Sequence, residues 1–297
     1  MDRFNDETLP ADLQRRLEEG RIAVDNLRTM TVNLEQVNEK LRLSEEMRSN
    51  FLSNIRNEMN NPLAAILGLA RQIADRKVDA ETAGTMAGTV YREAFDLDFQ
   101  LRNIFAAAEL EAGEVSFSIA RLDVASLLRQ LVADFSHRAE EKRVALQVDA
   151  GAPDGGQLLF TTDPEKLKIV LANLLANAVE FTKEGTRASV HVRRDGGTLT
   201  IAVADQGPGI PPADRKKVFD RFVQLDTGAR KRHRGHGLGL SIAKAYAEML
   251  GGSMALSSEE GRGCVFTLSV AELLSAGSVD ASSSDGNEFI FEPGTGS

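Results

Sequence analysis

The sequence contains one cysteine and no long hydrophobic run. A single cysteine excludes a disulfide framework and most cysteine-ligated metal sites, so the composition suits a reducing compartment. The longest apolar run, Leu63 to Ala70, is far shorter than the roughly 20 residues that a membrane-spanning helix needs. The first residues lack a basic end followed by an apolar core, so they show no secretory signal. The sequence therefore predicts a cytoplasmic protein with no membrane span.

The sequence also contains fewer basic than acidic residues. Its 297 residues include 35 Lys and Arg and 44 Asp and Glu, which give a formal net charge of −9. This balance argues against a general nucleic-acid binder, so no nucleic-acid partner is expected. Five of the acidic residues lie in residues 271–297, which contain no Lys or Arg. That segment is rich in Ser and Gly and lacks a periodic apolar pattern, which predicts a disordered acidic tail.

What the sequence does contain is a long helical pattern at its start. Apolar residues alternate in steps of three and four at Leu27, Met30, Leu34, Val37 and Leu41. This is the spacing of a two-stranded coiled-coil seam, so residues 1–44 are predicted to form an N-terminal helix and coiled coil. A single helix packed on its own domain is the alternative, although its flanks are too polar to bury.

The same spacing continues in two further segments. It runs through Leu52, Ile55, Met59, Pro62, Ile66, Leu69 and Ile73, and after a polar break it returns at Val90, Ala94, Leu97, Leu101, Ile104 and Ala108. Residues 45–113 are therefore predicted to form an antiparallel helical hairpin. A hairpin with one narrow apolar stripe per helix needs a partner, and a dimeric four-helix bundle supplies one.

After Gly113 the apolar period changes, and strands and helices follow one another. Alternating residues predict strands at 144–148, 188–192, 199–203 and 264–270, and helical patterns lie at 127–135, 163–179 and 238–250. Asp195-Gly-Gly predicts a tight hairpin turn. The whole chain is thus an α+β protein whose residues 114–270 form a two-layer α/β sandwich.

Two segments of this domain suit a nucleotide. Asn173 and Asn177 lie one helical turn apart and offer neutral oxygens to Mg²⁺ and phosphates, although an asparagine on a helix is more often simply solvated. Asp205 follows a strand and can accept a hydrogen bond from an exocyclic amine, while Gly207 and Gly209 let the backbone approach a ring closely. An ordinary tight turn explains these two glycines equally well.

A third segment suits phosphate. Gly235, Gly237 and Gly239 run into a helix, where free backbone amides and the helix dipole favour anions. The chain's densest basic cluster precedes them and consists of Arg230, Lys231, Arg232 and Arg234. A solvated loop is the alternative for this cluster, but basic charge beside a phosphate-binding turn has an electrostatic purpose.

The order of these segments, with Phe219-Asp-Arg-Phe between the last two, resembles the N, G1, F and G2 boxes of sensor histidine kinases. The resemblance covers about residues 45–270, and it likens the hairpin to their dimerisation and phosphoacceptor domain. It implies ATP and Mg²⁺ as cofactors, with Asn177 holding Mg²⁺, Asp205 recognising adenine and Phe181 lining the base pocket. It also implies an ATP lid at residues 223–236, and either a homodimer or a mixed dimer with another histidine kinase.

The sequence departs from this family where the phosphate should be accepted. Asn57 occupies the place of the phosphorylated histidine, and the amide lone pair is delocalised, so autophosphorylation there is not expected. The resemblance makes Glu58 a general base and Asn61 a residue that can orient water during dephosphorylation of a response regulator. Phosphatase activity or docking of a receiver domain can therefore survive. An exposed polar helix face is the plainer interpretation of both residues.

Two smaller departures lie in the ATP domain. Glu180 stands where the family usually has a cation, so phosphate affinity is expected to fall unless another cation compensates. Cys264 replaces a frequent Thr and is interpreted as a small buried side chain.

The leading hypothesis is a histidine-kinase-like signalling protein of two-component or phosphorelay type. As a pseudokinase it binds Mg-ATP but does not phosphorylate itself, and it acts through a partner kinase or a response regulator. One rival is an active kinase that phosphorylates a histidine on a separate protein. Another is a nonenzymatic dimeric scaffold with a vestigial ATP site.

Overall fold

The computed structural model describes residues 11–76, 78–151, 156–225 and 237–273. Within its first helix, the side chains of residues 11–14, 40, 41 and 43–58 are outside that description. The predicted lid cluster, Gly235 and nearly all of the acidic tail also lie outside the described residues.

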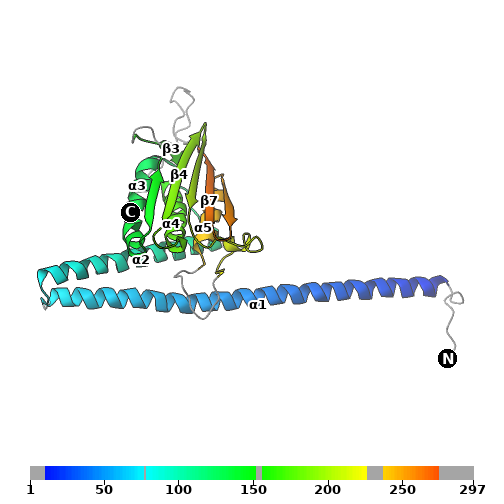
Figure 1. Ribbon diagram of the computed structural model, residues 1–297. Coiled ribbons are helices and arrows are strands. Elements are labelled where there is room, and N and C mark those ends of the chain that lie inside the picture. Colours follow the sequence, from blue (N-terminus) through cyan, green and yellow to red (C-terminus); the bar gives the residue numbers. More distant parts are fainter. Residues whose placement is uncertain (1–10, 77, 152–155, 226–236, 274–297) are drawn as a thin grey trace, which may run out of the picture.

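The helical part consists of α1 (Ala11–Ala74) and α2 (Ala80–Ala112), which pair as an antiparallel hairpin (Figure 1). The Asp79 carboxylate caps α2 by accepting a hydrogen bond of 2.7 Å from the Thr82 amide, and Gly113 ends the helix in the left-handed conformation. The hairpin was predicted, but its first helix is longer than expected. No helix end separates residues 44 and 45, because residues 21–61 contain neither Gly nor Pro to stop the helix.

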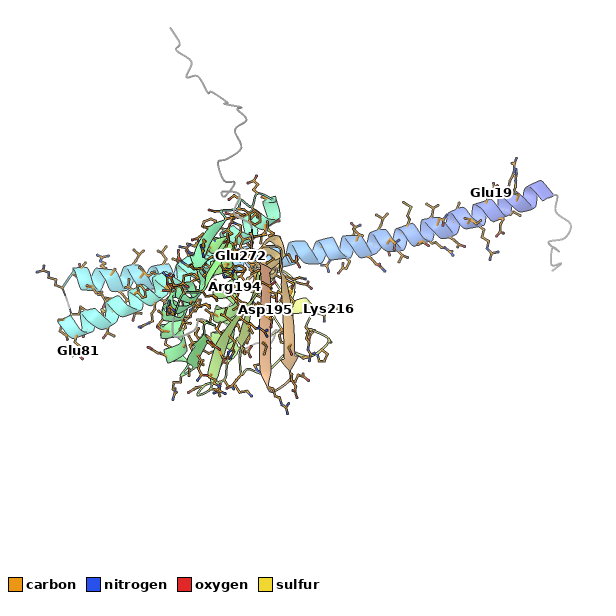
Figure 2. The ribbon with its side chains drawn as sticks, turned by 90° about the horizontal axis from the view of Figure 1, so that it is seen from above. Glu19, Glu81, Arg194, Asp195, Lys216 and Glu272 are labelled. Atoms are coloured by element: carbon orange, nitrogen blue, oxygen red, sulfur yellow. The ribbon has the colours of Figure 1, made fainter. Side chains whose placement is uncertain are left out.

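The predicted coiled-coil seam is exposed on this single chain. Leu27, Met30, Leu34 and Val37 have exposed fractions of 52 to 64%. In Figure 2, Glu19 marks the end of α1 that projects away from the hairpin tip, where Glu81 lies. A helix this long with an uncovered apolar seam is what a coiled coil requires, and the dimer stays a prediction.

The second part is a sandwich built on a five-stranded sheet. The strands are β2 (Ala145–Asp149), β4 (Arg187–Asp195), β5 (Thr198–Ala204), β7 (Gly263–Ala271) and β6 (Ser253–Glu259), in that spatial order. Only β2 and β4 run parallel. A separate pair joins β1 (Ala120–Asp123) to β3 (Leu159–Thr162). The predicted turn at Asp195-Gly-Gly connects β4 to β5.

Helices cover one face of the main sheet and make the second layer. They are α3 (Val124–Glu141), α4 (Pro164–Phe181) and α5 (Gly239–Met249), and a short 3₁₀ turn, η3, spans Lys217–Phe219. In β5, Leu199, Ile201 and Val203 are buried, and the residues between them lie on the more exposed face. The core therefore lies between sheet and helices, which confirms the predicted α+β class and two-layer sandwich.

The sandwich sits on α2, on the side away from α1 (Figure 1). Phe95 and Phe99 of α2 meet Phe135 of α3 edge-on, with ring centroids 5.5 and 5.6 Å apart. The Arg138 guanidinium lies over these rings and binds the Asp96 carboxylate at 2.6 Å. This contact joins the helical hairpin to the sandwich.

The sandwich extends slightly beyond its predicted C-terminal boundary at residue 270. Strand β7 continues to Ala271, and Glu272 then pairs with Arg194 at 2.6 Å and accepts a bond from the Thr161 amide. Figure 2 shows Arg194 and Glu272 close together beside Asp195. The composition of the tail could not predict this contact, because Arg194 and Thr161 lie more than 70 residues from Glu272 in the sequence.

Candidate functional site

Asp205 lies directly after β5 and is almost buried, with 7% of its surface exposed. Its Oδ1 accepts hydrogen bonds from the amides of Gly207 (2.8 Å) and Cys264 (3.2 Å). Burial raises the pKa of this carboxyl, although the two amides act in the opposite direction. Both of these backbone bonds go to one oxygen, and the carboxylate also interacts with the Cys264 thiol.

Gly207 lets the turn after Asp205 pack tightly against the end of α4. A Cβ atom at this position would lie 2.6 Å from the Phe181 carbonyl oxygen and 2.8 Å from Asp205 Oδ1. Any other residue would therefore displace the carboxylate or the helix end. Gly209 follows in the same turn with a φ of 74°. The structure thus brings the predicted Phe181, Asp205, Gly207 and Gly209 together.

Asn173 and Asn177 lie one turn apart on α4, as predicted, but in different surroundings. Asn173 is 3% exposed and donates to Asn103 Oδ1 of α2 at 2.7 Å and to the Ile169 carbonyl at 3.0 Å. Its own Oδ1 faces Gly239, where a Cβ would lie 2.5 Å away. Asn177 is only partly buried, so it is the more accessible of the two.

The predicted phosphate-binding glycines lie at the start of α5. Gly237 accepts a hydrogen bond of 2.8 Å from the Phe222 amide, which joins this segment to the Phe219-Asp-Arg-Phe segment. Helix α5 begins at Gly239 without a side-chain cap, so its first amides are not satisfied by a capping side chain. The contact between Gly239 and Asn173 places this helix start beside α4.

A cation, Lys142, lies beside Glu180, which occupies the position where the family usually has a cation. Lys142 follows α3, and its ammonium donates to the Glu180 carbonyl oxygen and lies 3.6 Å from the Glu180 carboxylate. The pair partly neutralises the negative charge that Glu180 adds near the end of α4. Lys142 and Asn103 were both missed from the sequence, because each contacts α4 from an element far away in the chain and no local spacing marks it.

Cys264 is buried beside Asp205, as expected for a small side chain. Burial raises the pKa of its thiol to about 11, so the thiol stays protonated at neutral pH. Its sulfur lies 3.3 Å from the Ser258 hydroxyl.

The predicted phosphoacceptor segment lies within α1. Asn61 is exposed, while the side chains of Asn57 and Glu58 are outside the described part of the chain. The helix continues through Pro62. Helical geometry puts residues 57 and 61 one turn apart on the same face.

The fold and these contacts define a two-layer α/β sandwich attached to a helical hairpin. Residues 162–274 match the family described as histidine kinase-, DNA gyrase B-, and HSP90-like ATPase. The chain is 31% identical over 248 residues to the sensor-like histidine kinase SenX3 of Mycolicibacterium smegmatis, covering 84% of this chain and 63% of the relative. It is 32% identical to the sensor histidine kinase TmoS of Ectopseudomonas mendocina, covering 78% and 24% of the two chains. These matches show a histidine-kinase core with its ATPase domain in this chain.

A solved structure agrees with that conclusion. The crystal structure of full-length ShkA in complex with AMPPNP is 30% identical, with a TM-score of 0.51, and the match covers 75% of this chain and 46% of that one. The chain therefore spans only part of the proteins that it matches. Among the described residues, no helix has the length and apolar character to cross a membrane. Nor do His, Cys, Asp and Glu side chains in the described part of the chain form a cluster of three or more that could hold a metal.

Proposed function

We propose that this protein binds Mg-ATP through its sandwich domain and acts in two-component signalling without phosphorylating itself at Asn57. The observation that carries the ATP part is Asp205, a nearly buried carboxylate with one oxygen held by two backbone amides. Because burial raises the pKa of this carboxyl, its charged form is costly to the folded protein, and a ligand that donates a hydrogen bond explains its presence. The adenine amine is such a donor.

Asn177 would hold Mg²⁺ together with the nucleotide phosphates. Magnesium favours oxygen ligands and usually binds with substrate phosphates, so one amide oxygen from the protein fits this mode. The metal would neutralise phosphate charge. The amides at the start of α5, which no side chain caps, and the cluster of Arg230, Lys231, Arg232 and Arg234 would bind the same phosphates.

The accepting group decides what happens to the bound ATP. An asparagine at residue 57 has no nucleophilic nitrogen, so a phosphoryl group has no usual acceptor on this chain. We propose that the protein pairs with an identical chain or a related histidine kinase, and that it docks the receiver domain of a response regulator. Exposed Asn61 beside Glu58 would then orient water for dephosphorylation of that receiver.

A separate test decides between this proposal and its two rivals. Calorimetry with Mg-ATP should show binding by the wild-type protein, and Asp205→Ala and Asn177→Ala should both abolish it. An absence of binding at millimolar ATP would favour the nonenzymatic scaffold. Transfer of labelled phosphate to a supplied partner hairpin, lost in the same two variants, would favour a kinase that acts on a separate protein. The Lys142–Glu180 pair argues against a decayed site, because the Lys142 ammonium offsets the negative charge of Glu180.

A further inference from the structure

Ser258 lies near the end of β6, and its hydroxyl connects two segments around Asp205. The hydroxyl oxygen accepts a hydrogen bond of 2.8 Å from the Ile210 amide and donates one of 3.0 Å to the Gly263 carbonyl. The Cys264 sulfur lies 3.3 Å away. A serine hydroxyl has one hydrogen and two lone pairs, so these three neighbours account for its full bonding capacity.

These bonds form a continuous chain that ends at the Asp205 carboxylate. The Gly263 carbonyl and the Cys264 amide belong to the same peptide group. Ser258 donates to the carbonyl side of that group, and its amide side donates to Asp205 Oδ1 at 3.2 Å. Hydrogen bonds in such a chain polarise one another, so the Ser258 hydroxyl strengthens and aligns the bond that holds Asp205.

The backbone around Ser258 makes the same connection. The Gly261 amide donates to the Pro208 carbonyl at 2.6 Å, and the Asp205 amide donates to the Cys264 carbonyl at 2.9 Å. The β6–β7 hairpin thus supports the turn from Asp205 to Ile210 along its length. Among these contacts, Ser258 is the side chain that bonds to both the turn and the hairpin.

We infer that Ser258 is a positioning residue for base recognition, one that sets the orientation of Asp205 toward the exocyclic amine of adenine. This inference rests on the proposed ATP binding at Asp205. Removing the hydroxyl leaves the Ile210 amide and the Gly263 carbonyl without their partner, and it weakens the bond that holds Asp205 Oδ1. The base should lose affinity, while the phosphate contacts on α4 and α5 remain.

The test compares Mg-ATP with purine riboside triphosphate, which lacks the exocyclic amine, by calorimetry on the full chain. Ser258→Ala should weaken ATP binding about five- to tenfold, the equivalent of roughly one hydrogen bond. It should leave the affinity for purine riboside triphosphate unchanged. Ser258→Thr keeps a hydroxyl and should restore ATP binding. Ser253→Ala removes an exposed hydroxyl at the other end of β6 and serves as the matched control.

An equal loss for both nucleotides, or unchanged ATP binding by Ser258→Ala, would overturn the inference. If Ser258→Ala does not fold, Ser258→Cys keeps the side-chain size with a poor hydrogen-bonding group and is judged by the same criterion. A wild-type protein that binds no ATP would instead contradict the proposed function, and the inference with it. The two failures are therefore distinguishable from the wild-type titration alone.

Discussion

At the scale of single residues, Asp205 combines a cost to stability with a proposed role in base recognition. Its burial raises the pKa, which means that folding favours the protonated form. Its contribution to stability is therefore present below the ordinary pKa of 3.8 and is lost as the pH rises through the raised value. Under the proposed function, this carboxyl accepts a hydrogen bond from the base.

Asp205→Asn should separate these two effects. The amide keeps an oxygen for the Gly207 and Cys264 amides but carries no buried charge, so the variant should be at least as stable as wild type at pH 7. Its advantage should shrink as the pH falls toward 4, because the wild-type carboxyl then becomes protonated. Mg-ATP affinity should fall at least about tenfold through the loss of a charge-assisted bond. Urea unfolding at several pH values and calorimetry measure both, and a less stable variant with unchanged affinity would contradict this account.

Glu180 is the second informative residue, because its carboxylate is expected to oppose phosphate and Lys142 partly neutralises that carboxylate. Glu180→Lys should tighten Mg-ATP binding about fivefold at low salt, as expected for a charge reversal near a phosphate group in a partly solvated setting. The gain should diminish in 0.5 M NaCl, a concentration at which screening is strong. Glu184→Lys reverses a more exposed charge four residues later and is the matched control. Equal effects of the two substitutions would place the phosphates elsewhere.

At the scale of helices and strands, the sequence predicted the elements that carry strong patterns. Strands β4, β5 and β7 alternate cleanly because one face is buried, and α4 begins where the helical pattern at 163–179 was predicted, with Asp163 as its N-cap. Strands β1 and β3 have four residues each, too few for a visible period. Strand β6 lies at the sheet edge and is made largely of small and polar residues, so its pattern is weak. The site contacts of Asn103, Lys142 and Ser258 depend on tertiary packing and could not be predicted from local spacing.

The Asp163 cap is a place where an element's stability can be measured. Burial alone would raise the pKa of Asp163. Hydrogen bonds from Ser118 and Lys166 outweigh this effect and hold the pKa below its ordinary value. The nearly buried Lys166 ammonium lies 3.1 Å from the same carboxylate. Asp163→Ala removes the cap and leaves that ammonium unpaired, so it should destabilise the domain by about 3–5 kcal/mol.

Urea unfolding at pH 7 measures this loss, and Asp163→Asn, which keeps a capping oxygen, should lose less. The wild-type contribution is present above the ordinary pKa of 3.8 and is lost as the pH falls through the lowered value. The difference between wild type and Asp163→Ala should therefore narrow in acid. A difference below about 1 kcal/mol at pH 7 would show that the cap and the pair contribute only what surface groups do.

At the scale of the whole molecule, α1 carries the predicted coiled-coil seam, through which two copies are expected to pair. Leu34 lies in the exposed seam of this helix, and a charge there would be buried in a dimer. Leu34→Asp should weaken dimerisation on the order of a hundredfold, since an unpaired carboxylate would enter an apolar seam. Gln36→Asp adds the same charge away from the seam and should leave the dimer intact. Light scattering after size exclusion gives the mass of each variant, and a wild-type protein that runs as a monomer at micromolar concentration would refute the coiled-coil prediction.

The central claim combines a working ATP site with a missing acceptor, and one labelling experiment tests both. Wild type and Asn57→His are incubated with Mg-ATP labelled in the γ-phosphate, and acid-labile label on the protein is then measured. The account predicts no stable label on wild type and clear labelling of Asn57→His, which is lost again when Asn177→Ala is added. Stable phosphate on the wild-type chain, on a histidine or at residue 57, or an unlabelled Asn57→His would contradict it.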